Sequence, residues 1–267
     1  MERRLQRTQV LENTTVARDT VILRVDMGLP QLVEPGQFAM VHPLRAGCIL
    51  PRPFSILDAD ADSLTILVKV VGKGSRALAA LRPGEELRIF APLGSSFDVS
   101  ALSERECILV AGGVGLVPLH MLARRLRESA AHPVIPIFGA RSEEDLPRSL
   151  LRKEDVAWRL WVEKPSKPDC RKGLVTAGLE EAFEEHPDAV VTTCGPTPMM
   201  RAVATICRRE RRPLWLCLEE QMGCGAGVCR ACVVPAAAGD RMRTVCKDGP
   251  VFALDDIQFF TTAGSAS

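Results

Sequence analysis

The stretch CILVAGGVGLVPLHMLARRLRES, residues 107–129, decides the fold of this chain. Its first six residues are apolar or small, which predicts a buried strand. Its last fourteen place Leu116, Leu119, Leu122 and Leu126 on one stripe, the pattern of an amphipathic helix. A glycine-rich turn separates the two. The stretch therefore predicts one strand–turn–helix unit of a parallel sheet.

The same alternation continues downstream of this unit. The strand-like runs are VIPIFGA, WRLWVE, AVVTTCG and LWLCLEE. The helix-like runs between them are SEEDLPRSLL, LVTAGLEEAFEE and TPMMRAVATICRRE. Strands that alternate with helices predict a doubly wound α/β domain with a parallel sheet, which we place at residues 102–218.

The flanking segments have different patterns. Residues 1–101 carry short β-rich runs separated by Pro, Gly and Asp: DTVILRVD, GQFAMVHP, PFSILDAD, SLTILVKVV and EELRIFAPL. Many short strands at close intervals predict a β-barrel or a sandwich. Residues 219–267 show neither the two-residue period of a strand nor the 3.6-residue period of a helix. They are rich in glycine and cysteine at their start, so we treat them as a third unit.

Composition excludes several classes of function. Lys plus Arg total 34 against 33 Asp plus Glu, so no strong field attracts nucleic acid or an anionic membrane. The N-terminus MERRLQRTQV has no apolar core, which argues against a signal peptide. The longest uncharged run, 107–123, is too short and too rich in glycine to span a membrane. We expect a soluble, cytoplasmic protein whose ten cysteines form no disulfide framework.

Four of the cysteines are clustered as Cys224-x4-Cys229-x2-Cys232-x13-Cys246. This is the plant-type spacing of a [2Fe–2S] cluster. Glycines between the cysteines allow the loop to wrap closely around an inorganic core, because they adopt positive φ angles. A zinc site is the alternative, but it prefers two C-x2-C pairs. The spacing favours the iron–sulfur cluster.

Two motifs in the β-rich half suggest a flavin site. In RPFSI, residues 52–56, Arg52 offers donors for phosphate, Phe54 a flat face for an isoalloxazine ring, and Ser55 a hydroxyl. In VGKGS, residues 71–75, a glycine turn could cradle a pyrophosphate with its N–H groups. Taken singly, they could be a hairpin with an exposed Arg and an ordinary turn. Together they support the hypothesis of a bound flavin.

Two motifs in the α/β half suggest a dinucleotide site. AGGVGLVPL, residues 111–119, joins a strand to a helix, where glycines let phosphates approach the helix N-terminus. TCGPTPMM, residues 193–200, follows a later strand at the sheet edge that binds ligands. Cys194 could lie beside a nicotinamide ring. A plain strand-to-helix turn and a buried core cysteine are the alternatives.

These motifs, in this order, resemble the ferredoxin–NADP reductase superfamily, in which an FAD-binding β-barrel precedes a nicotinamide-binding α/β domain. With the cysteine loop added, nearly the whole chain is similar to the electron-transfer subunits of NAD-linked, two-subunit dihydroorotate dehydrogenases. The resemblance implies the cofactors FAD, NAD and a [2Fe–2S] cluster.

The resemblance also implies site residues. Those for FAD are Arg52, Pro53, Phe54, Ser55, Leu67, Val68, Lys69, Gly74 and Ser75. Those for the dinucleotide are Gly112, Gly113, Gly115 and Pro118, with Cys194 and Gly195 near its reactive ring. The cluster ligands are Cys224, Cys229, Cys232 and Cys246. No acid–base pair is expected, because the cofactors carry the chemistry.

The implied function is electron transfer between NAD and a flavin in a catalytic partner, through the cluster and FAD, in pyrimidine biosynthesis. The implied partner is an FMN-containing dihydroorotate dehydrogenase subunit in a heterotetramer, and we expect Met222 and Val228 to contact it. The three units account for the 267 residues, so the substrate site should lie on the partner. The alternatives are a free-standing reductase, a reductase subunit of another flavoprotein complex, and a zinc-bearing interaction module.

The chain departs from the family at a few positions. Phe54 stands where Tyr is common, and Val68-Lys69 replaces an aromatic–Arg pair, so bidentate contact with phosphate is lost. After the run VIPIFGA comes Arg141-Ser142-Glu143-Glu144. Carboxylates there suit a ribose 2′-hydroxyl and repel a 2′-phosphate, so we expect NAD rather than NADP.

Overall fold

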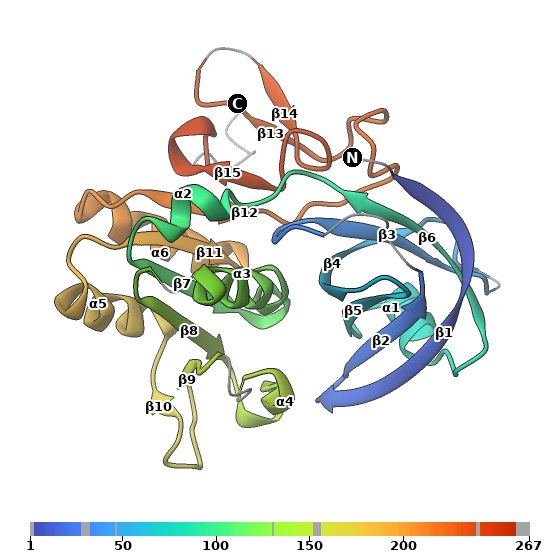
Figure 1. The fold of residues 1–267 in the computed structure, drawn as a ribbon, viewed down its shortest axis with the longest axis horizontal. Helices are drawn as coiled ribbons and strands as arrows, with labels where there is room; N and C mark the ends of the chain where they lie inside the picture. The colour runs from blue at the N-terminus through green and yellow to red at the C-terminus, as the bar shows by residue number, and fades with distance from the viewer. Residues whose placement is uncertain are drawn as a thin grey trace, which may run out of the picture.

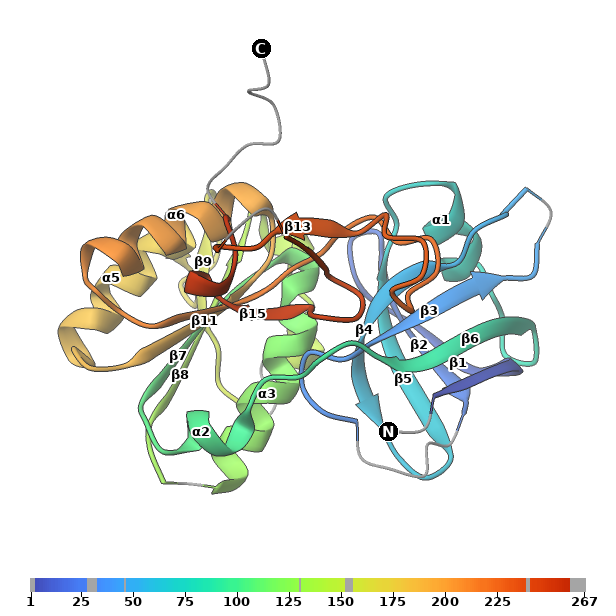
Figure 2. The same ribbon diagram turned by 90° about the horizontal axis from the view of Figure 1, so that it is seen from above.

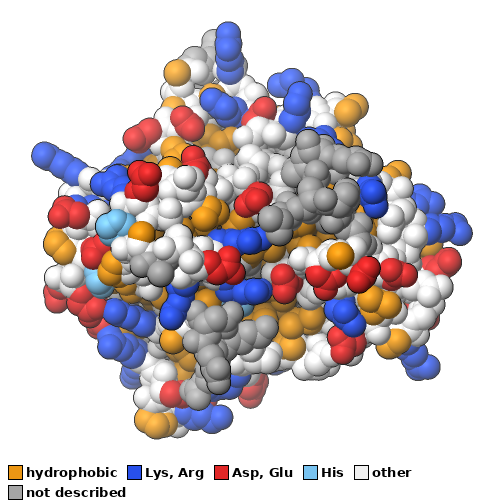
Figure 3. Space-filling model, in the orientation of Figure 1, with side chains coloured by type: hydrophobic (Ala, Val, Ile, Leu, Met, Phe, Trp, Pro, Cys, Tyr) orange, Lys and Arg blue, Asp and Glu red, His pale blue; other side chains and the backbone are white. Residues whose placement is uncertain are grey.

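The computed structural model describes residues 3–27, 33–45, 47–129, 131–151, 156–238 and 241–259. It has two lobes, with a C-terminal segment that lies across both of them (Figures 1 and 2). Acidic and basic side chains are interspersed over the face shown in Figure 3. Within the described residues, no helix is long and apolar enough to cross a bilayer.

The first lobe is a closed six-stranded antiparallel barrel in the order β1-β2-β5-β4-β3-β6. Its strands are β1 (Arg4–Ala17), β2 (Thr20–Asp26), β3 (Phe38–Pro43), β4 (Arg52–Ala59), β5 (Ser63–Lys69) and β6 (Glu86–Leu93). The short helix α1 (Lys73–Ala79) follows β5. Leu23, Leu64 and Ile89 are fully buried in the barrel core. The expected barrel is confirmed.

The second lobe is a seven-stranded sheet in the order β10-β9-β8-β7-β11-β12-β15. Its parallel strands are β7 (Cys107–Gly112), β8 (Val134–Ala140), β9 (Arg159–Val162), β10 (Arg171–Lys172), β11 (Val190–Cys194) and β12 (Leu214–Cys217). The strand β15 (Val251–Ala253) pairs antiparallel with β12. The doubly wound parallel sheet that the sequence predicts is confirmed, and the C-terminal segment adds one antiparallel edge strand to it.

Helices cover both faces of this sheet. They are α2 (Val99–Ser103), α3 (Leu116–Ser129), α4 (Arg148–Leu151), α5 (Val175–Glu185) and α6 (Thr197–Arg209). Successive side chains of β7 point to opposite faces. Ile108 and Val110 therefore share a core with α5 and α6, whereas Leu109 and Ala111 share one with α3. This two-sided burial explains why the strand is continuously apolar.

Some elements differ from the expectation. The long strand β1 was not among the predicted runs, because its outer face carries mostly polar side chains. The helix α1 was not predicted. The helix expected in residues 142–151 consists of a 3-10 turn, η2 (Glu143–Asp145), and the four residues of α4. The short η1 (Gly113–Gly115) leads into α3, and η3 (Leu254–Asp256) follows β15.

The C-terminal segment crosses from the sheet to the barrel and back. After β12 the chain runs through the cysteine loop to the hairpin β13 (Val233–Pro235) and β14 (Met242–Thr244). The loop packs on the barrel: a Cβ added at Gly225 would lie 2.4 Å from Cγ of Met40 and 3.1 Å from Cδ1 of Leu93. Positive φ at Gly225 and Gly227 lets the loop make this approach.

Candidate functional site

Backbone N–H groups point at the sulfur atoms of the cysteine loop. The Sγ of Cys224 accepts hydrogen bonds from the N–H groups of Ala226 and Cys229, both at 3.4 Å. The Sγ of Cys246 accepts one from Gly227 at 3.1 Å, and that of Cys232 accepts one from Cys246 at 3.4 Å. N–H groups directed at sulfur stabilise thiolates and tune the potential of a bound cluster.

The four thiols lie as two pairs. The side chain of Cys224 interacts with that of Cys229, and the side chain of Cys246 interacts with that of Cys232. A two-iron cluster shares four cysteines between two irons, so these four thiols fit a [2Fe–2S] cluster.

The pairs differ in exposure. Cys232 and Cys246 are each 1 % exposed, Cys224 is half-buried, and Cys229 is exposed. Partial burial disfavours the Cys224 thiolate, but the N–H groups of Cys229 and Ala226 outweigh it and lower the pKa of that thiol to about 6. One pair thus faces solvent and the other faces the protein.

A cavity of about 1210 Å³ lies between the two lobes. The barrel contributes Phe38, Pro53, Phe54, Ser55, Leu67 and Lys69 to its wall. The carboxyl edge of the parallel sheet contributes Gly112, Gly113, Gly139, Arg141, Glu163 and Gly195, among others. The start of the C-terminal segment contributes residues 219–222. All three predicted units therefore face one space.

Five of the nine predicted FAD residues line this cavity: Pro53, Phe54, Ser55, Leu67 and Lys69. The other four, Arg52, Val68, Gly74 and Ser75, do not. Val68 is buried in the barrel core. A Cβ added at Gly74 would lie 1.8 Å from Cζ of Arg52, so glycine is needed for the guanidinium to lie there. The Ser75 hydroxyl accepts hydrogen bonds from Val71 and Gly72, which shapes the glycine turn.

Three of the six predicted dinucleotide residues line the cavity: Gly112, Gly113 and Gly195. Gly113 has φ +57°, and a Cβ added there meets no atom within 4 Å, so its backbone borders open space. Gly115 instead packs against β11, since a Cβ there would lie 2.2 Å from the carbonyl oxygen of Cys194. Pro118 is buried in α3, away from the cavity wall.

The side chain of Cys194 lies behind the cavity wall and is fully buried. Cys194 stands beside Cys217 in the β11–β12 ladder, and it is Cys217 that lines the cavity. The interaction with Cys217, together with burial, raises the pKa of the Cys194 thiol. Cys194 therefore remains a neutral thiol.

Glu219 is a cavity residue that the sequence analysis missed. It follows β12 and lines the cavity, and the residue is exposed to solvent. Desolvation by the neighbouring protein atoms raises the pKa of its carboxyl group. The available signal was its place at the carboxyl end of a predicted strand, the edge where such sheets bind ligands.

A clasp of charged residues closes the rim of the cavity between the lobes. Arg18, in the β1–β2 turn, bonds Glu144 at 2.7 Å and Asp145 at 2.9 Å. Its backbone N–H also donates to the carbonyl oxygen of Glu144 at 2.8 Å. Lys69 lies 3.6 Å from Asp145. A residue proposed for FAD phosphate is thus held by a carboxylate of the other lobe.

Comparison with known proteins identifies both functional segments. Residues 219–258 match the family model of the iron–sulfur cluster binding domain of dihydroorotate dehydrogenase B. Residues 109–205 match the oxidoreductase NAD-binding domain.

Relatives match almost the whole chain. A dihydroorotate dehydrogenase B (NAD(+)) electron transfer subunit homolog of Aquifex aeolicus is 34% identical, over 93% of this chain and 96% of the relative. The corresponding subunit of Shouchella clausii is 34% identical, over 96% and 99%. The solved structure of an NADH-dependent reduced ferredoxin-NADP oxidoreductase superposes with a TM-score of 0.80, at 25% identity, over 94% of this chain and 90% of that one.

Proposed function

The chain belongs to the family of the dihydroorotate dehydrogenase B electron transfer subunits, and on this basis we propose that it passes electrons between NAD and a flavin in a catalytic partner subunit. The observation that carries the proposal is the cavity faced by all three segments, with the cysteine loop packed against the barrel beside it. The partner would oxidise dihydroorotate in pyrimidine biosynthesis. The family makes the chain an oxidoreductase subunit with FAD, NAD and a [2Fe–2S] cluster as cofactors.

Each unit would hold one cofactor, with boundaries near residues 101 and 218. In the barrel, Phe54 would stack on the flavin and Ser55 would hydrogen-bond it, while Arg52, Lys69 and the glycine turn would face the phosphates. When bound, FAD exchanges a hydride with NAD and single electrons with the cluster, which nicotinamide cannot do.

The sheet edge would hold the dinucleotide. Gly113 leaves room for it to approach the flavin, because a Cβ there would enter open space, whereas Gly112 and Gly195 allow the ends of β7 and β11 to pack against each other and Met199. Glu219 and Cys217 stand on the same wall. We assign Glu219 the role of hydrogen-bonding the nicotinamide end, since its carboxyl group lies on this wall.

Cys224, Cys229, Cys232 and Cys246 would hold the cluster. The more exposed pair, Cys224 and Cys229, would face the partner, and the buried pair would face the cavity side. Backbone N–H groups from residues 226, 227 and 229 would orient the sulfurs and keep their charge stabilised.

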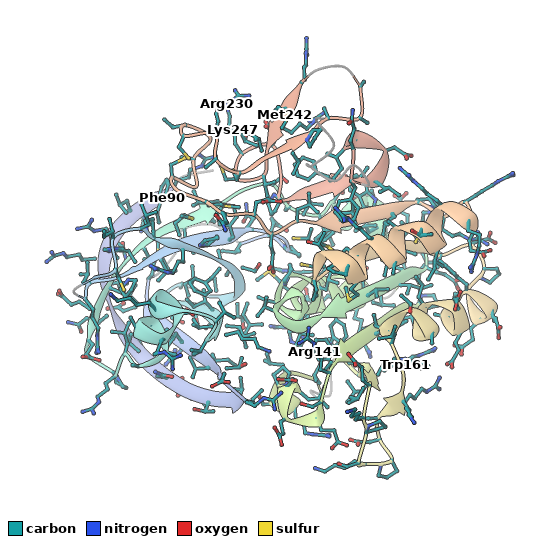
Figure 4. All side chains as sticks on the ribbon, turned by 180° about the vertical axis from the view of Figure 1, so that it is seen from behind. Phe90, Arg141, Trp161, Arg230, Met242 and Lys247 are labelled. Atoms are coloured by element: carbon teal, nitrogen blue, oxygen red, sulfur yellow. The ribbon has the colours of Figure 1, made fainter. Side chains whose placement is uncertain are left out.

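The partner would bind at the cluster face, which we define as Val228, Arg230, Met242 and Lys247. Val228 is 80% exposed and Met242 43% exposed. Arg230, Met242 and Lys247 lie around the cysteine loop in Figure 4, with Phe90 on the neighbouring barrel. An apolar centre with basic neighbours fits a surface that carries carboxylates. Met222, which the sequence also suggested, lines the cavity and packs on the core instead.

The finer assignments are also proposals. The partner would contain FMN, the assembly would be a heterotetramer, and the complex would work in the cytoplasm. A second candidate function is supported by the superposition with the NADH-dependent reduced ferredoxin-NADP oxidoreductase. In that case the chain would be the NAD(P)H-dependent reductase subunit of a different flavoprotein complex, with the same cofactor sites.

The test is dihydroorotate-dependent reduction of NAD by the complex, purified anaerobically through a tag on this chain. We expect activity that Cys229→Ser abolishes while FAD stays bound. Cys170→Ser, at a buried cysteine outside the loop and the cavity wall, should keep activity. Failure of the wild-type complex to use dihydroorotate, with FAD and cluster present, would reject this substrate and support the second candidate.

A further inference from the structure

Two cysteines stand side by side at the carboxyl edge of the sheet. Cys194 is the last residue of β11 and Cys217 is the last residue of β12, and the two are register partners in neighbouring parallel strands (Figure 1). Both side chains belong to the core that packs against α3, so they point to the same face of the sheet. Their thiols are hydrogen-bonded to each other. The two residues therefore form a dithiol.

The spacing of the two residues suits a disulfide. Neighbouring strands lie about 4.8 Å apart. The Cα atoms of a disulfide lie about 4.4 to 6.8 Å apart. Register partners whose side chains share one face therefore meet this requirement without a shift of the backbone. Both cysteines are free thiols in this structure, so the pair can be oxidised.

The arrangement is specific to these two strands. Among the cysteines outside the loop, all of which the structure describes, only Cys194 and Cys217 are register partners in a sheet. Cys107 has a valine opposite it on each neighbouring strand. Cys48, Cys170 and Cys207 lie outside the strands.

The two thiols differ in their access to the cavity. Cys217 lines the cavity wall, whereas Cys194 lies behind the wall and has no exposed surface. Cys217 is itself only 2 % exposed, so the cavity is the route to its sulfur and admits small solutes. A small oxidant in the cavity therefore meets Cys217 first. Cys194 is then in place to react with the group that forms on the Cys217 sulfur.

We propose that Cys194 and Cys217 are a redox-active dithiol that hydrogen peroxide converts to a disulfide, with Cys217 as the attacking cysteine and Cys194 as the resolving one. The Cys217 sulfur attacks one peroxide oxygen and becomes a sulfenic acid, while the O–O bond breaks and the other oxygen leaves with the thiol proton as water. The Cys194 sulfur then displaces the hydroxyl group and forms the S–S bond, and the hydroxyl leaves with the second thiol proton as water. The two sulfurs lose the two electrons that the peroxide gains.

The disulfide protects the cavity wall. It prevents the further, irreversible oxidation of Cys217 to a sulfinic acid, and a thiol reductant restores the dithiol. This inference concerns the ends of β11 and β12 and does not depend on the substrate of the partner subunit.

The test is treatment of the FAD-loaded full chain with hydrogen peroxide, followed by alkylation of free thiols and peptide mapping. Trypsin with a glutamate-specific protease releases residues 186–201, whose only cysteine is Cys194, and residues 212–219, whose only cysteine is Cys217. We expect these peptides to be linked, lighter by two hydrogen atoms than their sum, and to separate with dithiothreitol. Met222 is half-buried on the same wall, and its sulfoxide reports that peroxide has reached the cavity.

Variants separate the two roles. Cys194→Ser removes the resolving thiol, so Cys217 should accumulate sulfenic acid, trapped with dimedone, and sulfinic acid several-fold above wild type. Cys217→Ser should leave Cys194 reduced, because Cys194 lies behind the wall. Cys207→Ser, at a buried cysteine of α6, is the matched control and should form the same linked peptides.

The outcomes separate this inference from the proposed function. Oxidised Met222 in wild-type protein whose Cys194 and Cys217 are both still free thiols would overturn the dithiol. Sulfenic acid at Cys194 in Cys217→Ser would overturn the assigned order of reaction. A complex that fails to oxidise dihydroorotate but forms the linked peptides would reject the proposed substrate and leave this inference standing.

Discussion

Arg18 of the barrel donates hydrogen bonds to both carboxylate oxygens of Asp145 in the α/β domain, at 3.0 and 2.9 Å. The two residues are 127 positions apart in the chain and meet at the rim of the cavity. The contact joins the lobes on the side opposite the cysteine loop. The cavity is therefore bounded on one side by the C-terminal segment, which crosses between the lobes, and on the other side by this clasp of charged residues.

Arg18→Gln should loosen the clasp. Because exposed ion pairs are weak and screened by salt, we expect little change in thermal stability but faster release of FAD, several-fold at low salt. Stopped-flow fluorescence of released FAD measures the rate. Arg24→Gln, which breaks an exposed pair with Glu12 within the barrel, is the control. Equal release rates for Arg18→Gln and wild type at low salt would contradict the role of the clasp.

The clasp should also depend on pH. Burial tends to raise the pKa of Asp145, but the hydrogen bonds from Ser142 and Arg18 and the Lys69 charge lower it overall. A carboxyl with a lowered folded pKa stabilises the fold above its unfolded pKa, about 3.9, and loses this as pH falls through the folded value. The effect of Arg18→Gln on FAD release should therefore be constant from pH 8 to 5 and diminish only below about 4.

Glu219→Gln should stabilise the cofactor-free protein at neutral pH. Desolvation in the cavity wall raises the pKa of Glu219 in the fold, so ionisation costs stability above the unfolded pKa of about 4.3, by an amount that the solvent exposure of the residue reduces. The gain should be full above the raised folded pKa and should shrink as pH falls toward about 4. Melting curves across pH measure it. A gain in stability that grew toward acidic pH would contradict the raised pKa of Glu219. Glu220→Gln, on the same cavity wall, is the matched control.

Gly115→Ala should disrupt the dinucleotide site. The new Cβ would lie 2.2 Å from a backbone oxygen of β11, which cannot rotate away, so α3 must shift. Such overpacking costs about 1–3 kcal/mol. We expect a lower melting temperature and weaker ADP-ribose binding. Gly72→Ala, where an added Cβ meets nothing within 4 Å, should be neutral in both measurements.

Cys229→Ser and Cys232→Ser should both lose iron and inorganic sulfide, but they should differ in stability. Cys229 is exposed, whereas Cys232 is 1 % exposed and contacts the core. In cluster-free protein, only Cys232→Ser should lower the free energy of unfolding, by about 1–3 kcal/mol for a buried hydroxyl. Both should retain FAD, because no cysteine of the loop lines the cavity. Loss of FAD from either variant would contradict the separation of the FAD site from the cluster site.

Charge reversal on the cluster face should weaken the complex. Arg230→Glu with Lys247→Glu should slow association with the partner at low salt, because basic side chains around Val228 would steer a surface with carboxylates. Arg211→Glu, at an exposed cation beyond α6, is the control. Surface plasmon resonance at two salt concentrations measures the rate. Association that is equally fast in the double variant would place the partner elsewhere.

The sequence by itself determined those features that are encoded in short stretches. Apolar runs with period 2 or 3.6 predicted five of the barrel strands, the strands from β7 to β12 except the two-residue β10, and the helices α3, α5 and α6. The cysteine spacing predicted a [2Fe–2S] cluster, because the loop brings three cysteines within nine residues. The fourth cysteine, Cys246, is brought back to the loop by the short hairpin of β13 and β14.

The tertiary structure alone decided what meets across the lobes. Glu143 and Glu144 follow the predicted strand β8, but both are bonded within the protein: Glu143 to Ser166 and Lys167, and Glu144 to Arg18. Glu163, which follows a different strand, lines the cavity. Glu219 faces the same space only because β12 ends beside β11. Periodicity reports which face of an element is buried. It does not report which distant carboxylate is paired and which is left open to a ligand, because that depends on contacts between residues far apart in the chain.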